Sequence, residues 1–340
     1  RLDEIRAMAL NIYMEQSAVR DGVTAEEVKG ILLGMASGQE TLLGYFRRFI
    51  RNFEKRVGIN RTVGSLRAYS NAYSHIERFL QAQYKLSDIP FSALDRSFID
   101  KYDLYLRTER NLAPGTIINL TVQLKTIVGE AIADGIITAS PFMGYEPMRP
   151  KHVQKYLTAE ELHRIMTTPL HRQTLYHVRD MFLFSCFTGI PYGDMRLLTK
   201  DNLCLAEDGI WWIKSARQKT KIEFEIPLLD LPLQILKKYS GTAPGDKLLP
   251  MYCNSTLNLY LKEIARICHI DRPLVFHAGR HTYATEITLS HGVPLETVSR
   301  MLGHSQIETT QIYAKVTDEK IDADTKALNR KISERFSVVI

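Results

Sequence analysis

The sequence predicts a mainly helical protein with one small β-sheet, divided into two domains. Apolar residues recur at three- and four-residue spacing through most of the chain, which is the period of helices with one buried face. Convincing strands are confined to residues 210–213 and 222–226, where β-branched and aromatic residues gather. A stretch with several prolines at 141–157 separates the helices before it from the strands after it, so we expect a linker there.

The composition is that of an ordinary globular protein of 340 residues, with 45% hydrophobic and 24% charged residues. No apolar run approaches the roughly 18 residues of a membrane span, and the amino terminus has no signal-peptide pattern. We therefore expect a cytoplasmic protein without membrane contact. The four cysteines lie far apart without a C-x-x-C pair, and the chain has no Walker-type glycine loop, so neither a metal nor another cofactor is predicted.

The first domain is predicted to consist of four helices within residues 41–140. They begin near Thr41, Thr62, Asp95 and Pro114, and the second and fourth have a capping threonine and a proline in the first turn. Residues 1–40 are acidic and weakly periodic, and we interpret them as a helical connector. Because the chain opens on Arg1 inside helical sequence, we expect another domain to precede it.

A basic patch marks the start of this domain. Residues 41–68 contain seven arginines and lysines against the single acid Glu54. Such a concentration favours contact with a polyanion over a merely solvated helix face. With basic residues of the linker and of the later hairpin, the predicted DNA-binding residues are Arg47, Arg48, Arg51, Lys55, Arg61, Arg67, Lys151, Lys155 and Lys221.

The second domain is predicted to span residues 158–325. Thr158 and Glu161 have the spacing of a capping box, and a strongly apolar helix at about 174–188 ends at Gly189. The two strands are joined by residues 214–221, which contain four cations. Further helices are expected at 232–239, 255–269 and 317–328, and residues 326–340 form an apolar tail.

The segment from Pro273 to Tyr313 contains the candidate chemistry. Three short helices are expected there, and they would carry His277, Arg280 and His304 close to Tyr313. Cationic neighbours would stabilise both a phenolate and the extra charge of a pentacoordinate phosphorus. His277 and His281 have helical i, i+4 spacing, so a structural pair is an equally open interpretation. A zinc pair is less favoured, because Ala278 stands where a metalloprotease helix has its glutamate.

Taken together, these motifs resemble the catalytic domain of tyrosine recombinases, the integrases of phages and mobile elements. The resemblance covers residues 150–325 and rests on Thr188-Gly189, the cationic hairpin, His277 with Arg280, Leu302-Gly303-His304, and Tyr313 nine residues after His304. The helical domain before it is similar to their core-site-binding domain. The sequences around Pro191 and Arg217 resemble integrases of Bacteroides-type conjugative transposons.

The resemblance implies site-specific DNA strand exchange through a covalent 3′-phosphotyrosine at Tyr313, without a cofactor. Arg280 would hold phosphate oxygens, His277 would act as a base or donor near the tyrosine, and His304 would donate to the phosphate. Lys219, with Lys221 as the alternative, would protonate the leaving 5′-oxygen. The implied partners are double-stranded attachment sites, three further copies in a tetramer on paired sites, and host or element-encoded DNA-bending factors.

One position departs from the family pattern. Pro191 stands where the pattern T-G-x-R has its first catalytic arginine, and proline offers no side-chain donor. We expect Arg217 to replace it, because alternate residues of a strand share a face and Arg217 precedes Lys219 by two. Arg196 is the second candidate.

The departure keeps two rival functions open. A type IB topoisomerase would share the phosphotyrosine chemistry, but the separate helical domain, the linker and the tail favour a recombinase. A catalytically silent DNA-binding regulator would explain Pro191. It would not explain why Arg280, His304 and Tyr313 are all present.

Overall fold

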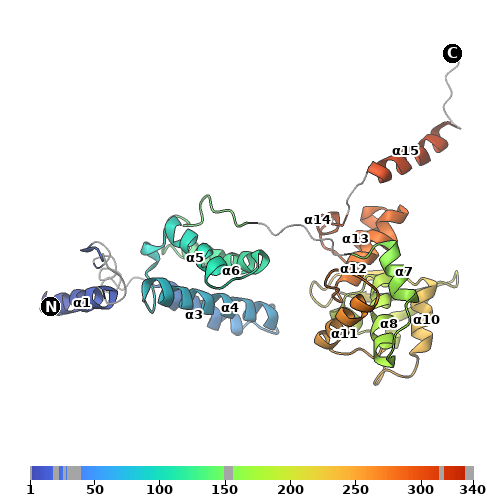
Figure 1. Cartoon of the computed structure of the whole chain (residues 1–340), viewed down its shortest axis with the longest axis horizontal. Helices are drawn as coiled ribbons and strands as arrows, with labels where there is room; N and C mark the ends of the chain where they lie inside the picture. Colours follow the sequence, from blue (N-terminus) through green and yellow to red (C-terminus); the bar gives the residue numbers. More distant parts are fainter. Residues whose placement is uncertain are drawn as a thin grey trace, which may run out of the picture. The chain divides into compact units, whose positions relative to one another are not determined.

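The computed structural model of the chain describes residues 2–17, 23–25, 28, 40–148, 156–313 and 318–333. The chain divides into two compact units, residues 1–152 and residues 153–340, whose elements are labelled in Figure 1. The first and last helices in sequence are α1 (Leu2–Ser17) and α15 (Asp318–Ser333). Helix α15 extends five residues beyond the predicted end at Leu328.

Four helices form the body of the amino-terminal unit, as predicted. They are α3 (Leu42–Glu54), α4 (Val63–Phe79), α5 (Arg96–Thr108) and α6 (Pro114–Ala133), with a π-helical turn η1 (Leu80–Tyr84) and a 3-10 turn η2 (Phe91–Ala93). The predicted cap at Thr62 is confirmed, because its Oγ1 accepts a hydrogen bond of 3.1 Å from Ser65 N. Asp95 caps α5 in the same way, accepting from Phe98 N at 2.7 Å.

Aromatic rings fill the core of this unit. Helix α4 packs against α3, α5 and α6, and Phe79 near its end is fully buried. The ring of Phe79 lies 5.0 Å from that of Tyr102 and 5.3 Å from those of Phe98 and Tyr105, centroid to centroid. Truncating such a residue to alanine costs about 3–5 kcal/mol, so this cluster is what holds the helices together.

The carboxy-terminal unit is built around α8 (Gln173–Thr188), which contacts α7, α10, α11 and α12 (Figure 1). Its described helices besides α8 are α7 (Ala159–Thr167), α9 (Tyr192–Met195), α10 (Asp230–Lys238), α11 (Asn254–Ile267), α12 (Ala278–Thr282), α13 (Leu295–Leu302) and α14 (Glu308–Gln311), with short turns η3 (Lys200–Asn202), η4 (Tyr283–Thr288) and η5 (Leu289–His291). The capping box predicted at Thr158 and Glu161 is present in both directions. Most of α8 is buried, as its dense apolar run indicated.

A three-stranded antiparallel sheet of order β1-β2-β3 completes this unit. Its strands are β1 (Leu203–Leu205), β2 (Trp211–Ala216) and β3 (Glu223–Pro227). Ile213 pairs with Ile226, and both side chains are buried against the core. Strand β1 was missed, since three residues are too few to show an alternating pattern. The end of β2 at Ala216 matters for the site below.

The segment with the candidate chemistry differs from the three simple helices expected. Helix α12 continues into the π-helical η4 and the 3-10 turn η5, and the chain turns at Gly292 (φ 83°) before α13 and at Gly303 (φ 64°) before α14. Five buried residues of this segment form their own cluster: Tyr283, Ala284, Val298, Leu302 and Tyr313. The candidate nucleophile is therefore part of a packed layer.

Gly189 joins α8 to this layer, and this position requires a glycine. Its backbone is left-handed (φ 70°), and a Cβ there would lie 2.4 Å from Cδ1 of Tyr283 and 2.8 Å from Cδ2 of Leu302. Only glycine allows both the turn and this close approach.

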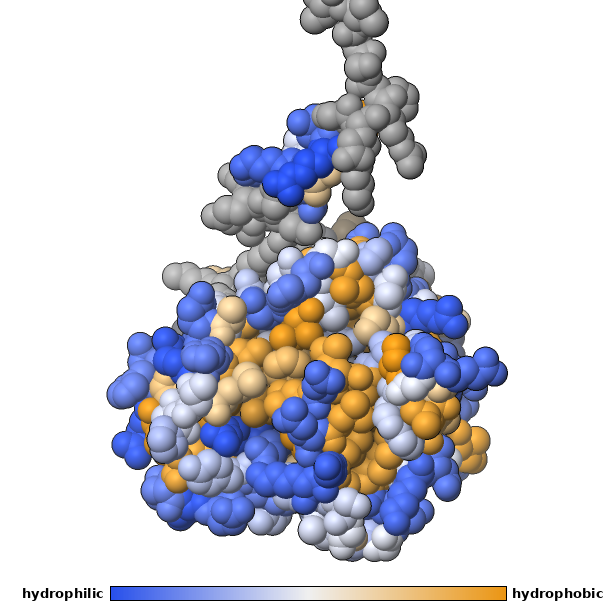
Figure 2. All heavy atoms as spheres, turned by 90° about the vertical axis from the view of Figure 1, so that its right-hand side faces the viewer, coloured by the Kyte–Doolittle hydropathy of each residue, from blue (hydrophilic) through white to orange (hydrophobic). Residues whose placement is uncertain are grey.

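One face of the unit, shown in Figure 2, has an area of hydrophobic residues surrounded and crossed by hydrophilic ones. In the described part of the chain, no helix has the length and apolar character to cross a membrane.

Candidate active site

Arg280 is the buried centre of the candidate site. It lies on α12 and is only 3% exposed. Its Nη1 donates to the carbonyl of Gly189 at 2.9 Å, and its Nη2 donates to the carbonyl of Leu302 at 2.7 Å. Nη2 also lies 2.8 Å from Nε2 of His304. Burial, followed by the charge of Arg217, lowers the pKa of Arg280 to about 10, which still leaves the guanidinium charged at neutral pH.

The two contacts of His304 fix its tautomer. A guanidinium can only donate, so Nε2 of His304, which faces Arg280, must be the unprotonated acceptor. Nδ1 then has the proton and donates to Oγ1 of Thr310 at 2.8 Å. Burial lowers the pKa of His304 to about 4, with further lowering by the charges of Arg280 and Arg217. The imidazole is therefore neutral at pH 7 and its ring orientation is held from both sides.

Tyr313 follows α14 and is 7% exposed. Its ring centroid lies 4.9 Å from that of His281, and 6.3 Å from that of His304 with the two rings nearly parallel (6°). Burial raises the pKa of the phenol, while the neighbouring charges of Arg280 and Arg217 oppose that rise. The phenol is thus protonated in this arrangement but lies in a cationic field that favours its ionised form.

Arg217 reaches the same place from the hairpin. Its Nε lies 2.6 Å from Oδ2 of the buried Asp194, and its Nη1 donates to the Leu302 carbonyl at 3.0 Å. Oδ1 of Asp194 accepts from Gln218 N at 2.8 Å, so one carboxylate holds both the side chain and the backbone of the hairpin. One carbonyl, that of Leu302, accepts from both Arg217 and Arg280.

The reason given from the sequence for Arg217 was wrong, because β2 ends at Ala216 and the side chain does not belong to an alternating strand. Arg217 N instead donates to the carbonyl of Ile222, and Lys221 N to that of Arg217, which closes a tight turn. Lys219 and Lys221 are exposed in this turn, and Lys221 has a left-handed backbone (φ 60°). Neither lysine contacts the buried cluster by any hydrogen bond or ion pair within the described ranges.

The remaining candidates lie at the edge of the cluster. Pro191 precedes α9, and Arg196 ends it as an exposed side chain. His277 is also exposed, and its ring contacts that of His281 at 4.9 Å between centroids. The chain of rings therefore runs from His277 through His281 to Tyr313. His281, which had no assigned role in the sequence, is the histidine of α12 that touches the tyrosine ring.

Two residues of this site escaped the sequence analysis, Asp194 and Thr310, and His281 was considered there only as the i+4 partner of His277. Asp194 and Thr310 act on partners 23 and 6 residues away, as their contacts with Arg217 and His304 show. A signal for Asp194 existed, because an acidic side chain next to a missing arginine can anchor its replacement. In the portion of the chain that the structure describes, no group of three His, Cys, Asp or Glu side chains could hold a metal ion.

The basic residues of the amino-terminal patch fall into two groups, those with a side-chain partner in the protein and those that are simply exposed. Arg47 donates to Tyr73 Oη at 2.5 Å, and Arg48 is paired with Glu40 at 2.8 Å. Arg51, Lys55, Arg61 and Arg67 are exposed. The predicted DNA-binding residues of the linker, Lys151 and Lys155, lie outside the described residues.

Two protein-family models match the chain. The phage integrase family matches residues 155–320, and the phage integrase SAM-like domain matches residues 41–147. The chain belongs to the phage integrase family. It is therefore an enzyme of the tyrosine recombinase type, which cleaves and rejoins DNA by transesterification.

Curated relatives of this family member include tyrosine recombinases XerD. That of Listeria monocytogenes serovar 1/2a is 25% identical over 273 residues, covering 75% of this chain and 89% of the relative. That of Staphylococcus saprophyticus is 26% identical over 297 residues, covering 83% and 96%. The similarity thus extends over both matched regions of the chain.

Solved integrase structures share the fold. The Tn1549 transposon integrase in complex with transposon right end DNA has a TM-score of 0.66 at 18% identity, covering 85% of this chain and 99% of that one. A lambda integrase dimer bound to a COC′ core site has a TM-score of 0.65 at 18% identity, covering 82% and 100%. The predicted fold class, helical with a small sheet, is confirmed.

Proposed function

We propose that this recombinase integrates or excises a mobile element, with Tyr313 as its nucleophile. The phenolic oxygen attacks the scissile phosphorus, the bond from phosphorus to the 5′-oxygen breaks, and a 3′-phosphotyrosine forms. The freed 5′-hydroxyl of the partner strand then attacks that phosphorus and releases Tyr313. The observation that supports this best is the convergence of Tyr313, Arg280 and His304 in one buried cluster.

Arg280 and Arg217 are proposed to hold the non-bridging phosphate oxygens. Guanidinium groups suit this task because their planar donors match phosphate geometry. Three of the five N–H donors of Arg280 go to Gly189, Leu302 and His304, and the guanidinium also hydrogen-bonds to Tyr313, so a phosphate held by Arg280 would lie next to the tyrosine. The two carbonyl bonds keep the guanidinium oriented before substrate arrives, so little reorganisation is needed.

His304 needs a change of state to take its proposed role. As it lies, Nε2 accepts from Arg280 and cannot donate to an oxygen. A phosphate dianion-like transition state would attract Arg280 and raise the proton affinity of the imidazole, because a nearby negative charge favours the cationic form. We propose that His304 takes up a proton on Nε2 as phosphate enters, while Thr310 retains Nδ1.

The proton of Tyr313 is proposed to leave through His281 of α12 and His277, the residue just before that helix. His277 is the proposed base, and the ring of His281 lies between it and the tyrosine. Lys219, or Lys221 as the alternative, delivers a proton to the 5′-oxygen. These lysines are exposed on a short turn beside Arg217, which is a suitable position for a group that completes the site when DNA binds.

Arg217 is the proposed replacement for the arginine absent at Pro191. The support is that Arg217 shares the Leu302 acceptor with Arg280 and contributes to the field at Tyr313. Arg196 is exposed at the end of α9 and contributes no such interaction within the part of the chain that is described. The Bacteroides-type transposon integrases, whose sequences around Pro191 this chain resembles, are the subgroup we propose.

The domains are proposed to divide the work on DNA. Residues 41–140 are proposed to contact the core site through six basic residues: Arg47, Arg48, Arg51, Lys55, Arg61 and Arg67. Residues 141–157 are proposed to link the domains, with Lys151 and Lys155 contacting the DNA backbone. Residues 158–325 are proposed to perform the chemistry. Residues 326–340 are proposed to contact a neighbouring copy. The assembly is a tetramer on paired attachment sites in the cytoplasm, aided by DNA-bending factors.

The proposal is tested by trapping the intermediate. A duplex from the joined ends of the encoding element is nicked next to the cleavage point, so that the cleaved fragment diffuses away and the adduct accumulates. Wild type should give an SDS-stable protein–DNA adduct, and Tyr313→Phe should give none. An adduct that persists in Tyr313→Phe, or its absence from wild type, would refute the assigned nucleophile.

A further inference from the structure

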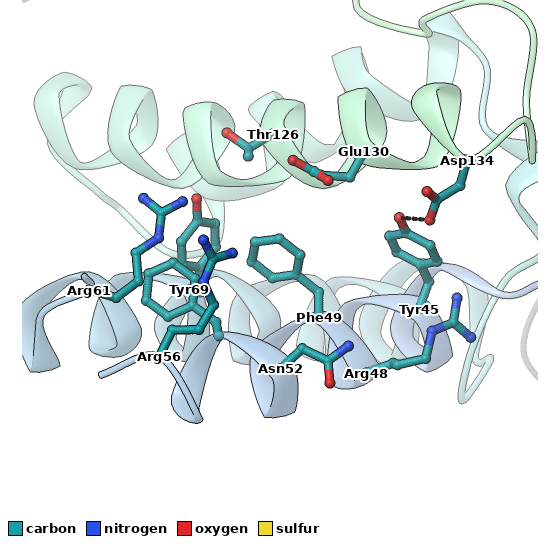
Figure 3. A pocket seen from close by; sticks show the side chains of 11 residues that line it. Tyr45, Arg48, Phe49, Asn52, Arg56, Arg61, Tyr69, Thr126, Glu130 and Asp134 are labelled. Atoms are coloured by element: carbon teal, nitrogen blue, oxygen red, sulfur yellow. Dashed lines mark hydrogen bonds between the residues drawn. The ribbon is translucent and has the colours of Figure 1, made fainter. Parts of the chain in front are cut away.

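A pocket of about 290 Å³ lies between α3 and α6 of the amino-terminal unit, remote in sequence from the residues of the proposed chemistry (Figure 3). Its floor is aromatic, one end has arginines, and the α6 side presents carboxylates. Each of these three types of group favours a different part of a ligand. The ligand can therefore be inferred part by part.

The floor offers ring surface for stacking. The centroid of Tyr69 lies 4.9 Å from that of Phe49 and 5.0 Å from that of Phe53. Phe53 is buried, but Phe49 and Tyr69 are only half-buried, and the ring of Phe49 points from α3 into the pocket in Figure 3. Partly exposed rings that meet in one cleft indicate a site for a flat apolar group.

Two exposed arginines lie at the Tyr69 end of the pocket. Arg56 and Arg61 are exposed, and neither is ion-paired with another residue that the structure describes. The guanidinium carbon of Arg61 lies 5.3 Å from the centroid of Phe53, so the charge lies beside the aromatic floor. In Figure 3 both side chains extend into the same end of the pocket. An anion held there would lie next to the flat group.

At the opposite end of the pocket, the side chains of Tyr45, Asp134 and Arg48 already have partners within the protein. Tyr45 Oη donates to Oδ2 of Asp134 at 2.7 Å, and the guanidinium of Arg48 lies 4.8 Å from the Tyr45 ring while pairing with Glu40. Glu130, which lies between the two ends on α6, points toward the pocket and is available as an acceptor (Figure 3). It would receive a hydrogen bond from the edge of a group stacked on Phe49.

Other ligand classes use only part of this pocket. A divalent cation is disfavoured, because Asp134 is bound by Tyr45 and three guanidinium groups lie nearby. An apolar molecule would desolvate Arg56 and Arg61 without compensation. A bare phosphate would leave the rings unused. A nucleotide supplies a flat base and an adjacent anion together.

We propose that the α3–α6 pocket binds one unstacked nucleotide. Its base lies on Phe49 and Tyr69, its phosphate contacts Arg56 and Arg61, and an exocyclic amino group of the base donates to Glu130. Adenine, cytosine and guanine have such a group and thymine does not. A base inside a duplex is stacked on both sides, so the ligand is an unpaired nucleotide, either in a strand or free. The inference goes beyond strand cleavage and does not depend on Tyr313.

The test uses the full chain with Tyr313→Phe, so that cleavage cannot contribute. The probe is a five-nucleotide thymidine strand with 2-aminopurine at its centre, whose fluorescence is quenched on stacking. We expect saturable quenching, weakened on the order of tenfold by Phe49→Leu, because stacking on an aromatic ring contributes about 1–3 kcal/mol per base. Arg61→Gln should weaken binding several-fold and reduce its dependence on salt.

Controls separate the pocket from general affinity for DNA. Arg78→Gln removes an exposed arginine of α4 that neither lines the pocket nor belongs to the residues proposed to contact the core site, and it should leave the quenching within twofold. dAMP should displace the probe about tenfold better than TMP, and Glu130→Ala should erase that difference. The free monophosphate of 2-aminopurine distinguishes a free nucleotide from a strand as the source. Absence of saturable quenching, or equal quenching in Phe49→Leu, Arg61→Gln and Arg78→Gln, would overturn the proposal.

Discussion

Replacing Arg217 by alanine should separate a catalytic arginine from a structural one. The side chain of Arg217 is 15% exposed and that of Asp194 5%, with 2.6 Å between Nε and Oδ2. Removing the cation leaves a buried carboxylate that retains one hydrogen bond, from Gln218 N. Breaking a buried pair in this way costs about 3 kcal/mol at the lower end of measured values. For a unit of this size, the melting temperature should fall by roughly 6–12 °C.

Cleavage should fall by more than this loss of stability explains. One missing donor to a developing oxyanion reduces the rate by about 10²–10³. The double variant Asp194→Ala/Arg217→Ala removes both charges, so the unpaired carboxylate disappears and part of the melting temperature should return. The adduct yield should stay as low as in Arg217→Ala, because the phosphate still lacks its second guanidinium.

The assay measures the initial rate of adduct formation on the nicked duplex, well below every melting temperature. Arg196→Ala is the matched control, because it removes an exposed arginine five residues after Pro191. It should retain the wild-type rate within about threefold. Recovery of cleavage in the double variant would show that Arg217 has only a structural role. Loss of cleavage in Arg196→Ala with retention in Arg217→Ala would reverse the assignment.

Three further predictions concern the surroundings of His304. Thr310→Val leaves the Nδ1 proton of His304 without an acceptor, so the rate of cleavage should fall about tenfold and its pH profile should change. Thr310→Ser should restore both the rate and the profile. An unchanged pH profile in Thr310→Val would contradict the assigned tautomer of His304. Folding lowers the pKa of His304 to about 4 from roughly 6.5 in the unfolded chain, so its contribution to stability is present above pH 6.5 and is lost as the pH falls toward 4. For this half-buried group we expect on the order of 1 kcal/mol after screening, measured by denaturant unfolding, and no such loss in His304→Gln. Gly303→Ala places a Cβ 2.8 Å from Cγ of Arg217 at φ 64°, so it should lower both the unfolding free energy, by about 1–2 kcal/mol, and the rate of adduct formation; wild-type values would show that Arg217 yields freely.

Local features were predictable because their causes lie within a few residues. Thr158 and Glu161 form a capping box whose two hydrogen bonds span three positions, and Thr62 caps α4 in the same range. Gly189 ends α8 because its left-handed turn is a local requirement. The helical nature of both units followed from the periodicity of apolar residues, whereas β1 was too short to show any period.

The candidate site was predictable in its residues but not in its contacts. Tyr313, Arg280 and His304 were identified by their types and order, yet the bond from Arg280 to His304 joins positions 24 apart, and no local pattern predicts it. Arg217 was identified on an incorrect strand argument, since the tight turn and Asp194 orient it. The role of His281 depends on how α12 faces Tyr313, which only packing decides.

The carbonyl of Leu302 has a bearing on how such an enzyme can change. Arg280 from α12 and Arg217 from the hairpin both donate to this one oxygen. The oxygen belongs to the main chain, so no point substitution at position 302 deletes it. A guanidinium lost from one element can therefore be replaced by one arriving from another, because the acceptor that orients it is inherited with the backbone. If Arg217 and Arg280 have the proposed roles, a proline at position 191 is compatible with an active enzyme, because the main-chain acceptor at position 302 orients an arginine from either element.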